Sequence, residues 1–307
     1  MIRDELFLNV EKSRLAHEQW KRFLPIFIKT QFSLYKSENA EFEFPIIEQH
    51  NRFNIMGPIA AKCKRKFEVY GTGDEGKRVC GLKQLKEINK AVRTSGQSEC
   101  VVFSIGSNNQ WNFEESVFNR TGCSIEVFDC TVAESVQPPK YMQPRVRLHR
   151  VCLGDQNIIR DGRQYVRWVD AIELAGLQTA PTYLKMDIEG YEFPLMRDII
   201  DGGVFLPLQI SMEVHLVRHE RNKPDWEHRV GSFELHTFFD NLFEFGGYHL
   251  VHRRENPFCA ICSEIVLARL DCHSRPLGSE GYRTLFSQSD NYLNQALAES
   301  AVIPYYE

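Results

Sequence analysis

Acidic side chains gather where one short apolar segment of the chain ends. Residues 183–186 are followed by Asp187, Glu189 and Glu192. Like charges this close repel one another, so folding alone gives little reason to place them together. Carboxylates at such a point can remove a proton from a hydroxyl group or hold a divalent cation. The alternative is a set of solvated loop acids, with Glu192 capping the next helix.

A second polar pair lies inside the next apolar segment, residues 209–215. Glu213 and His215 are two positions apart, so both side chains point to the same face of a strand. If this strand neighbours the preceding one, the pair approaches Asp187 and Glu189. These four residues are the candidate catalytic residues, because carboxylates and histidine are common general bases. The alternative for His215 is a buried ring with satisfied hydrogen bonds.

A glycine and an aspartate follow two earlier apolar segments. Gly106 directly follows residues 100–105, where a glycine lets the backbone turn sharply and approach a ligand. Asp129 ends residues 124–129, about 20 residues further on, where an acid can accept hydrogen bonds from ribose hydroxyls. The pair favours a nucleoside ligand. A nucleotide-dependent oxidoreductase is disfavoured, because the G-x-G-x-x-G fingerprint is absent.

Residues 71–77, GTGDEGK, fit the P-loop pattern G-x-x-x-x-G-K, but the residues around the pattern do not suit phosphate and magnesium binding. Arginine stands at position 78, where a P-loop needs serine or threonine to bind magnesium. Asp74 and Glu75 would also repel phosphates. We therefore reject an NTPase and interpret the glycines as a ligand-facing loop.

The nine cysteines are spread thinly, and an odd number cannot pair fully within one chain. Cys259 and Cys262 form a C-x-x-C pair, and Cys272-His273 would have to complete a zinc site. A predicted strand separates the two halves, so free thiols or a disulfide are favoured and no metal is expected.

Composition excludes several other classes of protein. Of 307 residues, 43% are hydrophobic and 25% charged, which is typical of a globular chain. The net charge of −4 argues against nucleic-acid binding.

No apolar run is long enough to span a membrane, and the first residues lack a signal peptide's apolar region, so we expect a cytoplasmic chain. The alternative is that a longer parent enters the secretory pathway. Only in that case could the sequon Asn119-Arg120-Thr121 accept a glycan. Otherwise it is a chance match in a helix.

The elements that position these residues follow from the alternation of apolar patterns. Strand-like and helix-like segments alternate from residue 82 onward, which indicates βαβ units and a parallel sheet. The last two apolar runs leave no room for a helix between them, so they are expected to pair antiparallel. Residues 1–35 read as helical, with a break at Pro25. The predicted strands are 67–70, 100–105, 124–129, 146–154, 182–187, 209–215, 248–254 and 263–269, and the predicted helices are 82–92, 110–120, 168–177, 194–200 and 232–245.

Five segments in this order resemble the methyltransferase-like protein 24 family, which is related to the FkbM-type methyltransferases. They are GTGDEGKRVCGL, VVFSIGSNNQWNFEESV, FDCT, YLKMDIEGYEF and QISMEVH. The resemblance covers about residues 65–270. It implies the Rossmann-like α/β fold of class I methyltransferases, a mostly parallel seven-stranded sheet with a terminal antiparallel hairpin. We expect this domain at 62–272, with an N-terminal helical extension at 1–61 and a C-terminal tail at 273–307 that packs on it.

The resemblance also implies S-adenosyl-L-methionine as cofactor and assigns residues to it. Asp187 and Glu189 would lie beside the sulfonium and the acceptor, and Asp129 beside the ribose. The loop after the first buried strand would line the methionine part, with Ser104, Gly106, Ser107 and Asn108. The acidic glycine-rich loop ahead of that strand would cover the cofactor, with Gly73, Asp74, Gly76 and Lys77.

Together these observations predict an S-adenosylmethionine-dependent methyltransferase that methylates a hydroxyl group of a small molecule or glycan. A catalytically inactive binding module with the same fold is the alternative, and an oxidoreductase is less favoured. We expect neither a nucleic-acid partner nor a membrane span in this chain.

Overall fold

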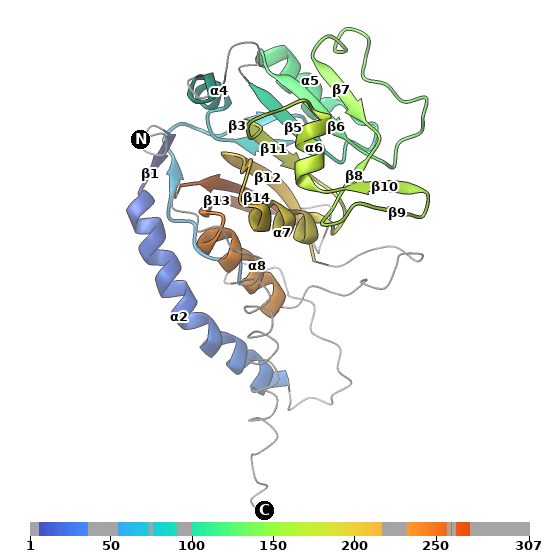
Figure 1. Ribbon diagram of the computed structural model, residues 1–307. Helices are drawn as coiled ribbons and strands as arrows, with labels where there is room; N and C mark the ends of the chain where they lie inside the picture. Colours follow the sequence, from blue (N-terminus) through green and yellow to red (C-terminus); the bar gives the residue numbers. More distant parts are fainter. Residues whose placement is uncertain are drawn as a thin grey trace, which may run out of the picture.

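A seven-stranded sheet forms the centre of the computed structural model (Figure 1). The structure describes residues 6–35, 55–73, 76–90, 100–216, 232–256, 259 and 262–270. The strand order is β13-β14-β12-β11-β5-β6-β7. All pairs from β12 to β7 are parallel, and only β14 runs antiparallel to its neighbours. The strands are β5 (Val101–Ile105), β6 (Ser124–Phe128), β7 (Val146–His149), β11 (Tyr183–Met186), β12 (Gln209–His215), β13 (Tyr248–Glu255) and β14 (Cys262–Arg269). The predicted Rossmann-like α/β fold is therefore confirmed.

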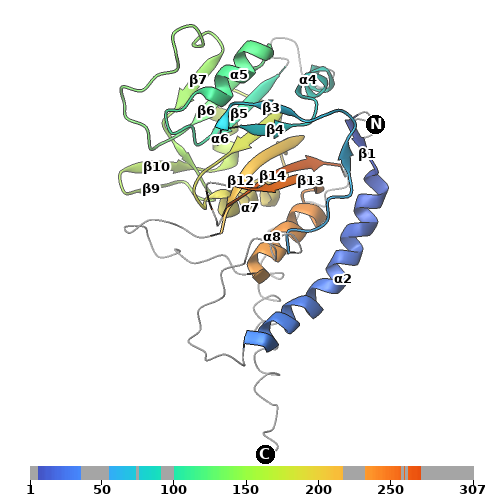
Figure 2. The same cartoon turned by 180° about the vertical axis from the view of Figure 1, so that it is seen from behind.

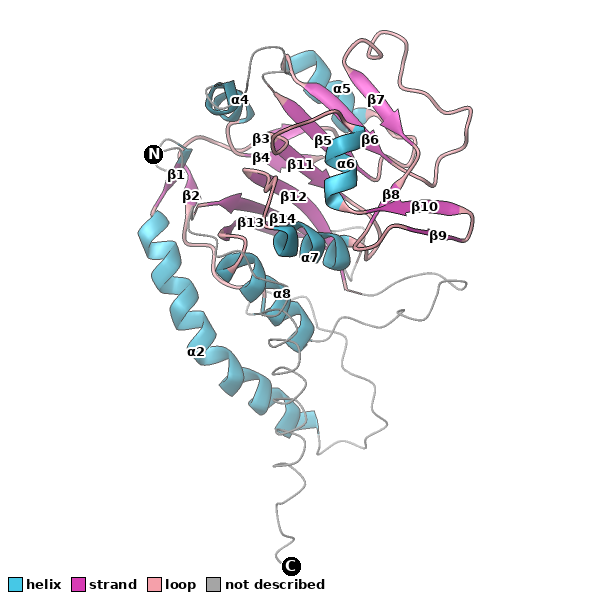
Figure 3. Cartoon of the chain, in the orientation of Figure 1, coloured by secondary structure: helices cyan, strands magenta, loops and turns pink. Residues whose placement is uncertain are grey.

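Helices cover both faces of the sheet, which explains why β5, β11 and β12 are buried along their whole length (Figures 2 and 3). One face packs against α6 (Trp168–Leu174), α7 (Glu192–Gly202) and α8 (Ser232–Glu244). The other packs against α4 (Leu82–Lys90), α5 (Asn112–Arg120) and the hairpin of β3 (Glu68–Tyr70) and β4 (Lys77–Val79). Each predicted helix and strand from residue 67 onward appears, with shifted ends.

The predicted strand at 146–154 is wrong in one respect, because it divides into two. β7 stays in the main sheet, whereas β8 (Cys152–Leu153) joins a small separate sheet. There it pairs with β10 (Arg163–Val166), which also pairs with β9 (Ile158–Arg160). The sequence analysis did not identify β9 or β10, which are only three and four residues long and show no alternation of apolar and polar residues.

The N-terminal segment forms one helix, α2 (Val10–Tyr35), which continues through Pro25. The predicted break is therefore wrong. Proline removes one backbone donor, the N–H that would bond to Lys21, and a helix of this length tolerates that loss. β1 (Phe7–Leu8) pairs with β2 (Lys62–Cys63), and His17 Nε2 of α2 lies 3.1 Å from Asp240 Oδ1 of α8. The extension is thus attached to the domain at both points. None of the described helices is long and apolar enough to cross a membrane.

Four disulfides join the described cysteines. They are Cys63–Cys80, Cys100–Cys123, Cys130–Cys152 and Cys259–Cys262. Cys100–Cys123 links the residues just before β5 and β6, and Cys130–Cys152 links the segment after β6 to β8. The ninth cysteine, Cys272, lies outside the described residues, as does the predicted tail at 273–307.

Candidate active site

The predicted site residues converge at the carboxyl ends of neighbouring strands. Gly106 follows β5, Asp129 follows β6, Asp187 follows β11 and His215 ends β12. These four strands are adjacent in the sheet, and ligands of open α/β sheets bind at this edge. Ligand atoms of Asp187, Glu189 and His215 lie within 4.8 Å of one another. The structure therefore brings together the two acidic segments that the sequence separates.

Gly106 is fixed between two strand ends. Its N–H donates to Phe128 O at 3.0 Å, and the buried Lys185 ammonium donates to its carbonyl. Its φ is +75°, and a Cβ placed on it would lie 1.8 Å from Asp187 O. Only glycine allows this approach, because both the left-handed backbone and the clash exclude a side chain. The loop that starts at Gly106 is thus held directly against the end of β11.

Asp129 organises the same loop through its side chain. Its Oδ2 accepts hydrogen bonds from the N–H groups of Ser107 at 3.0 Å and Asn108 at 2.7 Å, and from the Ser107 hydroxyl at 3.3 Å. Its Oδ1 accepts from the N–H and hydroxyl of Thr131 at 2.8 and 2.6 Å. Five protein donors therefore surround the carboxylate that the sequence assigns to ribose, and that assignment remains a prediction.

Lys77 lies elsewhere than the resemblance implies. It begins strand β4 rather than ending a loop, and its side chain is fully buried. Its Nζ lies 3.0 Å from Asp187 Oδ2, 2.6 Å from Glu264 Oε1 and 3.8 Å from Glu213 Oε2. Lys77 thus provides the positive charge among three carboxylates beneath the site.

This lysine decides which carboxylate is ionised. Burial alone would raise the pKa of Asp187, but the Lys77 ammonium, with Lys185 and His215 beyond it, holds the pKa below its usual value. Burial and the Asp187 charge raise the pKa of Glu213 to about 8. Burial also raises the pKa of Glu264. At neutral pH Asp187 is therefore anionic, and Glu213 is mostly protonated.

His215 lies between two acids of the segment that follows β11. Its Nδ1 is 2.9 Å from Glu192 Oε1, and its Nε2 is 3.5 Å from Glu189 Oε2. Burial would lower the pKa of His215, but the charges of Glu192, Asp187 and Glu189 outweigh it and raise the pKa to about 10. The ring is therefore an imidazolium at neutral pH. In this state it donates hydrogen bonds and cannot accept a proton.

Glu189 is the solvent-facing member of the group. Its side chain is 67% exposed, and its backbone has a left-handed φ of +55°. Glu192, by contrast, is fully buried and accepts from the N–H groups of Ile188 and Gly190 at 3.0 and 2.9 Å. Glu192 therefore fixes the turn that carries Glu189. This role differs from the two alternatives of the sequence analysis, a helix cap and a solvated loop acid.

Glu114, Lys185 and Asn256 shape the site but were not identified from the sequence. Ser104 was expected to line the cofactor, but it is fully buried and its hydroxyl donates to Glu114 Oε1 at 2.5 Å. Asn256 donates to Glu213 Oε1 at 2.6 Å. A charged residue inside an apolar strand could have revealed Lys185. A charged residue on an apolar helix face could have revealed Glu114.

The glycine-rich loop is only partly described. Gly73 has a φ of +61°, and the Gly76 N–H donates to Gly73 O at 3.3 Å. Asp74 lies outside the described residues. A separate cavity of about 200 Å³ lies beside the small sheet and the start of α7. Its lining comprises Gly154, Asp155, Gln156, Ile158, Arg160, Tyr165 and Tyr191.

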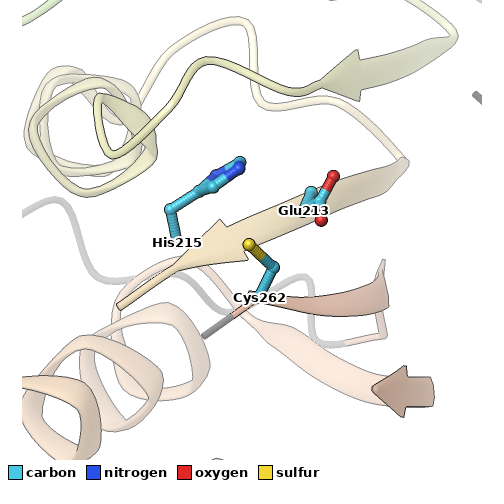
Figure 4. A group of neighbouring side chains, drawn as sticks. All are labelled: Glu213, His215 and Cys262. Carbon is cyan, nitrogen blue, oxygen red and sulfur yellow. The ribbon is translucent and has the colours of Figure 1, made fainter. Parts of the chain in front are cut away.

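Glu213, His215 and Cys262 also point toward one another, with ligand atoms within 4.8 Å (Figure 4). Cys262 pairs with His215 across β14 and β12. Its sulfur is bonded to Cys259, so it offers no thiolate to a metal.

Comparison with known proteins gives one family match. A family model described as a methyltransferase domain matches residues 16–269. No curated protein gives a significant match.

Solved structures give only distant likeness. The fibrillarin pre-rRNA processing protein of Methanococcus jannaschii is 12% identical, with 67% of this chain and 84% of that chain covered and a TM-score of 0.34. The N-methyltransferase NodS of Bradyrhizobium japonicum, solved with S-adenosyl-L-homocysteine, is 12% identical, covers 62% and 86%, and has a TM-score of 0.34. The N-terminal domain of EvdMO1, solved in the presence of S-adenosylhomocysteine and D-fucose, is 10% identical, covers 64% and 88%, and has a TM-score of 0.32.

Proposed function

The chain belongs to the methyltransferase domain family, and from this premise we propose that it transfers the methyl group of S-adenosylmethionine to a hydroxyl group of a small molecule or sugar. Within the family we place it beside the methyltransferase-like protein 24 and FkbM-type enzymes, on the five segments given above. The observation that carries the proposal is the meeting of the Gly106 loop, Asp129 and Asp187 at three adjacent strand ends.

The donor set at these strand ends fits such a cofactor. S-adenosylmethionine supplies a methyl group on a positively charged sulfur, and the ionised carboxylate of Asp187 suits that charge. Of the five donors around Asp129, two are the hydroxyls of Ser107 and Thr131, which can rotate away. Each carboxylate oxygen then has room for one ribose hydroxyl, while the backbone N–H groups keep the loop in place.

A hydroxyl acceptor must lose its proton as the methyl–oxygen bond forms, and Glu189 is suited to take it. It is exposed at the rim of the site, whereas Glu213 and His215 are protonated at neutral pH. We assign the proton to the Glu189 carboxylate. The His215 imidazolium beside it then orients that carboxylate, and buried Glu192 holds the ring. The chain's main contribution is the positioning of the two reactants, since displacement at a methyl carbon requires alignment.

Two measurements test this proposal. Calorimetric titration with S-adenosylhomocysteine examines the cofactor site without knowledge of the acceptor. A mass-spectrometric screen of hydroxyl-bearing small molecules and sugars, incubated with enzyme and S-adenosylmethionine, examines transfer. Binding with transfer to a hydroxyl supports the whole proposal. Binding of S-adenosylhomocysteine with no methyl transfer to any compound, by either the wild type or Glu189→Gln, would favour an inactive binding module.

A further inference from the structure

The sequon Asn119-Arg120-Thr121 lies on the side of the molecule away from the candidate active site. Helix α5 begins after the Gly106 loop and runs back along the sheet, so its last turn lies near the amino ends of β5 and β6 (Figures 1 and 2). Asn119 is in that turn and is exposed. Asp129 and Asp187 follow the opposite ends of the strands. A large group on Asn119 would therefore leave the site accessible.

The backbone around Asn119 is firmly held, so its side chain projects from a fixed position. Arg145 donates to the carbonyls of Phe118, Thr121 and Cys123 at 2.7 to 3.0 Å. The Arg120 guanidinium stacks over the Tyr70 ring at 4.1 Å. Thr121 ends the helix with an extended backbone and donates its hydroxyl to Val117 O at 2.7 Å. The sequon is thus at a helix terminus on the surface, not within a buried helix face.

The disulfides supply an independent observation about where the chain folds. Four disulfides join eight of the nine cysteines, and Cys100–Cys123 lies directly beside the sequon. Disulfides form and persist in oxidising compartments and are rare where thiols are kept reduced. Attachment of sugars to N-x-S/T sequons occurs in the secretory pathway, on surface segments. This many disulfides therefore favours the secretory alternative over the cytoplasmic expectation.

We propose that Asn119 carries an N-linked oligosaccharide and that the chain folds in an oxidising compartment of the secretory pathway. The donor is a lipid pyrophosphate-linked oligosaccharide. The bond from the first sugar's C1 to the pyrophosphate breaks, and a bond from that carbon to Asn119 Nδ2 forms. The amide loses one proton and the lipid pyrophosphate leaves. Because this transfer precedes folding, the Thr121 hydroxyl is available for recognition before it bonds to Val117. This inference is independent of the proposed methyl transfer.

The experiment expresses the full chain behind a cleavable secretion leader in eukaryotic cells and follows four forms. These are the wild type, Asn119→Gln, Thr121→Ala and Thr121→Ser. Peptide-N-glycosidase treatment should shift the wild type and Thr121→Ser by one step on a gel and leave the other two unchanged. Secreted and intracellular pools are both examined, so a variant that fails to fold still reports on modification. S-adenosylhomocysteine binding should be equal in wild type and Asn119→Gln.

Wild-type protein whose eight paired cysteines are oxidised, but whose Asn119 is unmodified, would overturn the assignment of the site. The compartment is tested separately on the protein made from its own gene. That protein should be glycosidase-sensitive and should resist alkylation at those eight cysteines. Endogenous protein with reduced cysteines and no glycan would overturn the proposed compartment.

Discussion

The buried Lys77 and the partly buried Asp187 form an ion pair, with Nζ 3.0 Å from Oδ2, across the boundary between the β3–β4 hairpin and the end of β11. The same ammonium also contacts Glu264 and faces Glu213. A segment that precedes the sheet in sequence therefore sets the charge state of the site. Asp187 is kept ionised at the point where a positively charged donor would lie.

Replacement of Lys77 by Met should destabilise the fold strongly. It leaves buried carboxylates without their cation, and breaking a buried pair in this way costs about 3–5 kcal/mol. Urea unfolding monitored by circular dichroism measures the effect. Lys83→Met, at an exposed position of α4, is the matched control and should change stability by less than about 0.5 kcal/mol. Equal effects of the two substitutions would contradict the importance of the buried pair.

Gly106→Ala should weaken the binding of S-adenosylhomocysteine by at least about tenfold. The new Cβ clashes with the Asp187 carbonyl, so the loop at the site must shift. A tenfold change in Kd corresponds to only about 1.4 kcal/mol of binding free energy. Gly162→Ala is the matched control. Its φ of +72° is similar to the +75° of Gly106, but no atom lies within 4 Å of an added Cβ. Isothermal titration calorimetry of both variants separates the clash from backbone strain, and a comparable loss in both would argue against the contact.

Asp129→Asn should weaken S-adenosylhomocysteine binding by more than about tenfold. The carboxylate now accepts hydrogen bonds from backbone N–H groups on both oxygens. The amide nitrogen of asparagine is a donor, so it would leave at least one of these N–H groups without an acceptor. Ser107→Ala and Thr131→Val remove only the rotating hydroxyls. If ribose replaces those hydroxyls, neither variant should weaken binding. Tight binding by Asp129→Asn would refute the ribose role, and large losses in the two hydroxyl variants would refute the exchange.

Stability should fall as the pH rises from about 6.5 to about 10, partly because of His215. In the folded state His215 has a pKa of about 10, whereas the ordinary pKa of histidine is 6.5. Between these values the folded state binds more protons than the unfolded state, so the free energy of unfolding decreases with pH. The His215→Gln variant should lose this part of the slope. Thermal unfolding across the pH range measures it, and identical slopes would show that the ring is not an imidazolium in the folded protein.

Glu213 produces a second interval of pH dependence at lower pH. Its pKa rises from the ordinary glutamate value of 4.5 to about 8 in the folded state, so its contribution to stability is lost as the pH rises through that interval. Glu213→Gln keeps the neutral form and should be relatively more stable than the wild type at pH 8 than at pH 5. The same unfolding series tests this, and the opposite order would place an ionised Glu213 beside Asp187.

The sheet was predictable from sequence because its strands are short apolar runs separated by helical patterns. The proximity of Asp187 and His215 followed from the rule that carboxyl ends of parallel strands share an edge. The continuous helix through Pro25 was not predictable, because proline in a helical pattern usually marks a break. The division at 150–151 was not predictable either, because the pairing of β8 with β10 is a tertiary contact that the local apolar pattern does not reveal.

The contacts of Lys77 and Glu192 could not be predicted from local pattern. Lys77 meets its acids across more than a hundred residues of chain, as in the 110-residue separation from Asp187. A glycine-rich, charged segment looks the same whether its lysine faces solvent or a buried carboxylate. Glu192 illustrates the converse, because an acid at a helix start is typical of capping, and only the fold reveals that it also holds His215.

Titration of the purified protein with S-adenosylhomocysteine tests the central claim most directly, since it requires no knowledge of the acceptor. The account predicts saturable one-to-one binding with a Kd below about 1 mM, weakened at least about tenfold in Gly106→Ala and unchanged in Gly162→Ala. No detectable heat of binding at millimolar ligand, from a protein shown to be folded by circular dichroism, would contradict it.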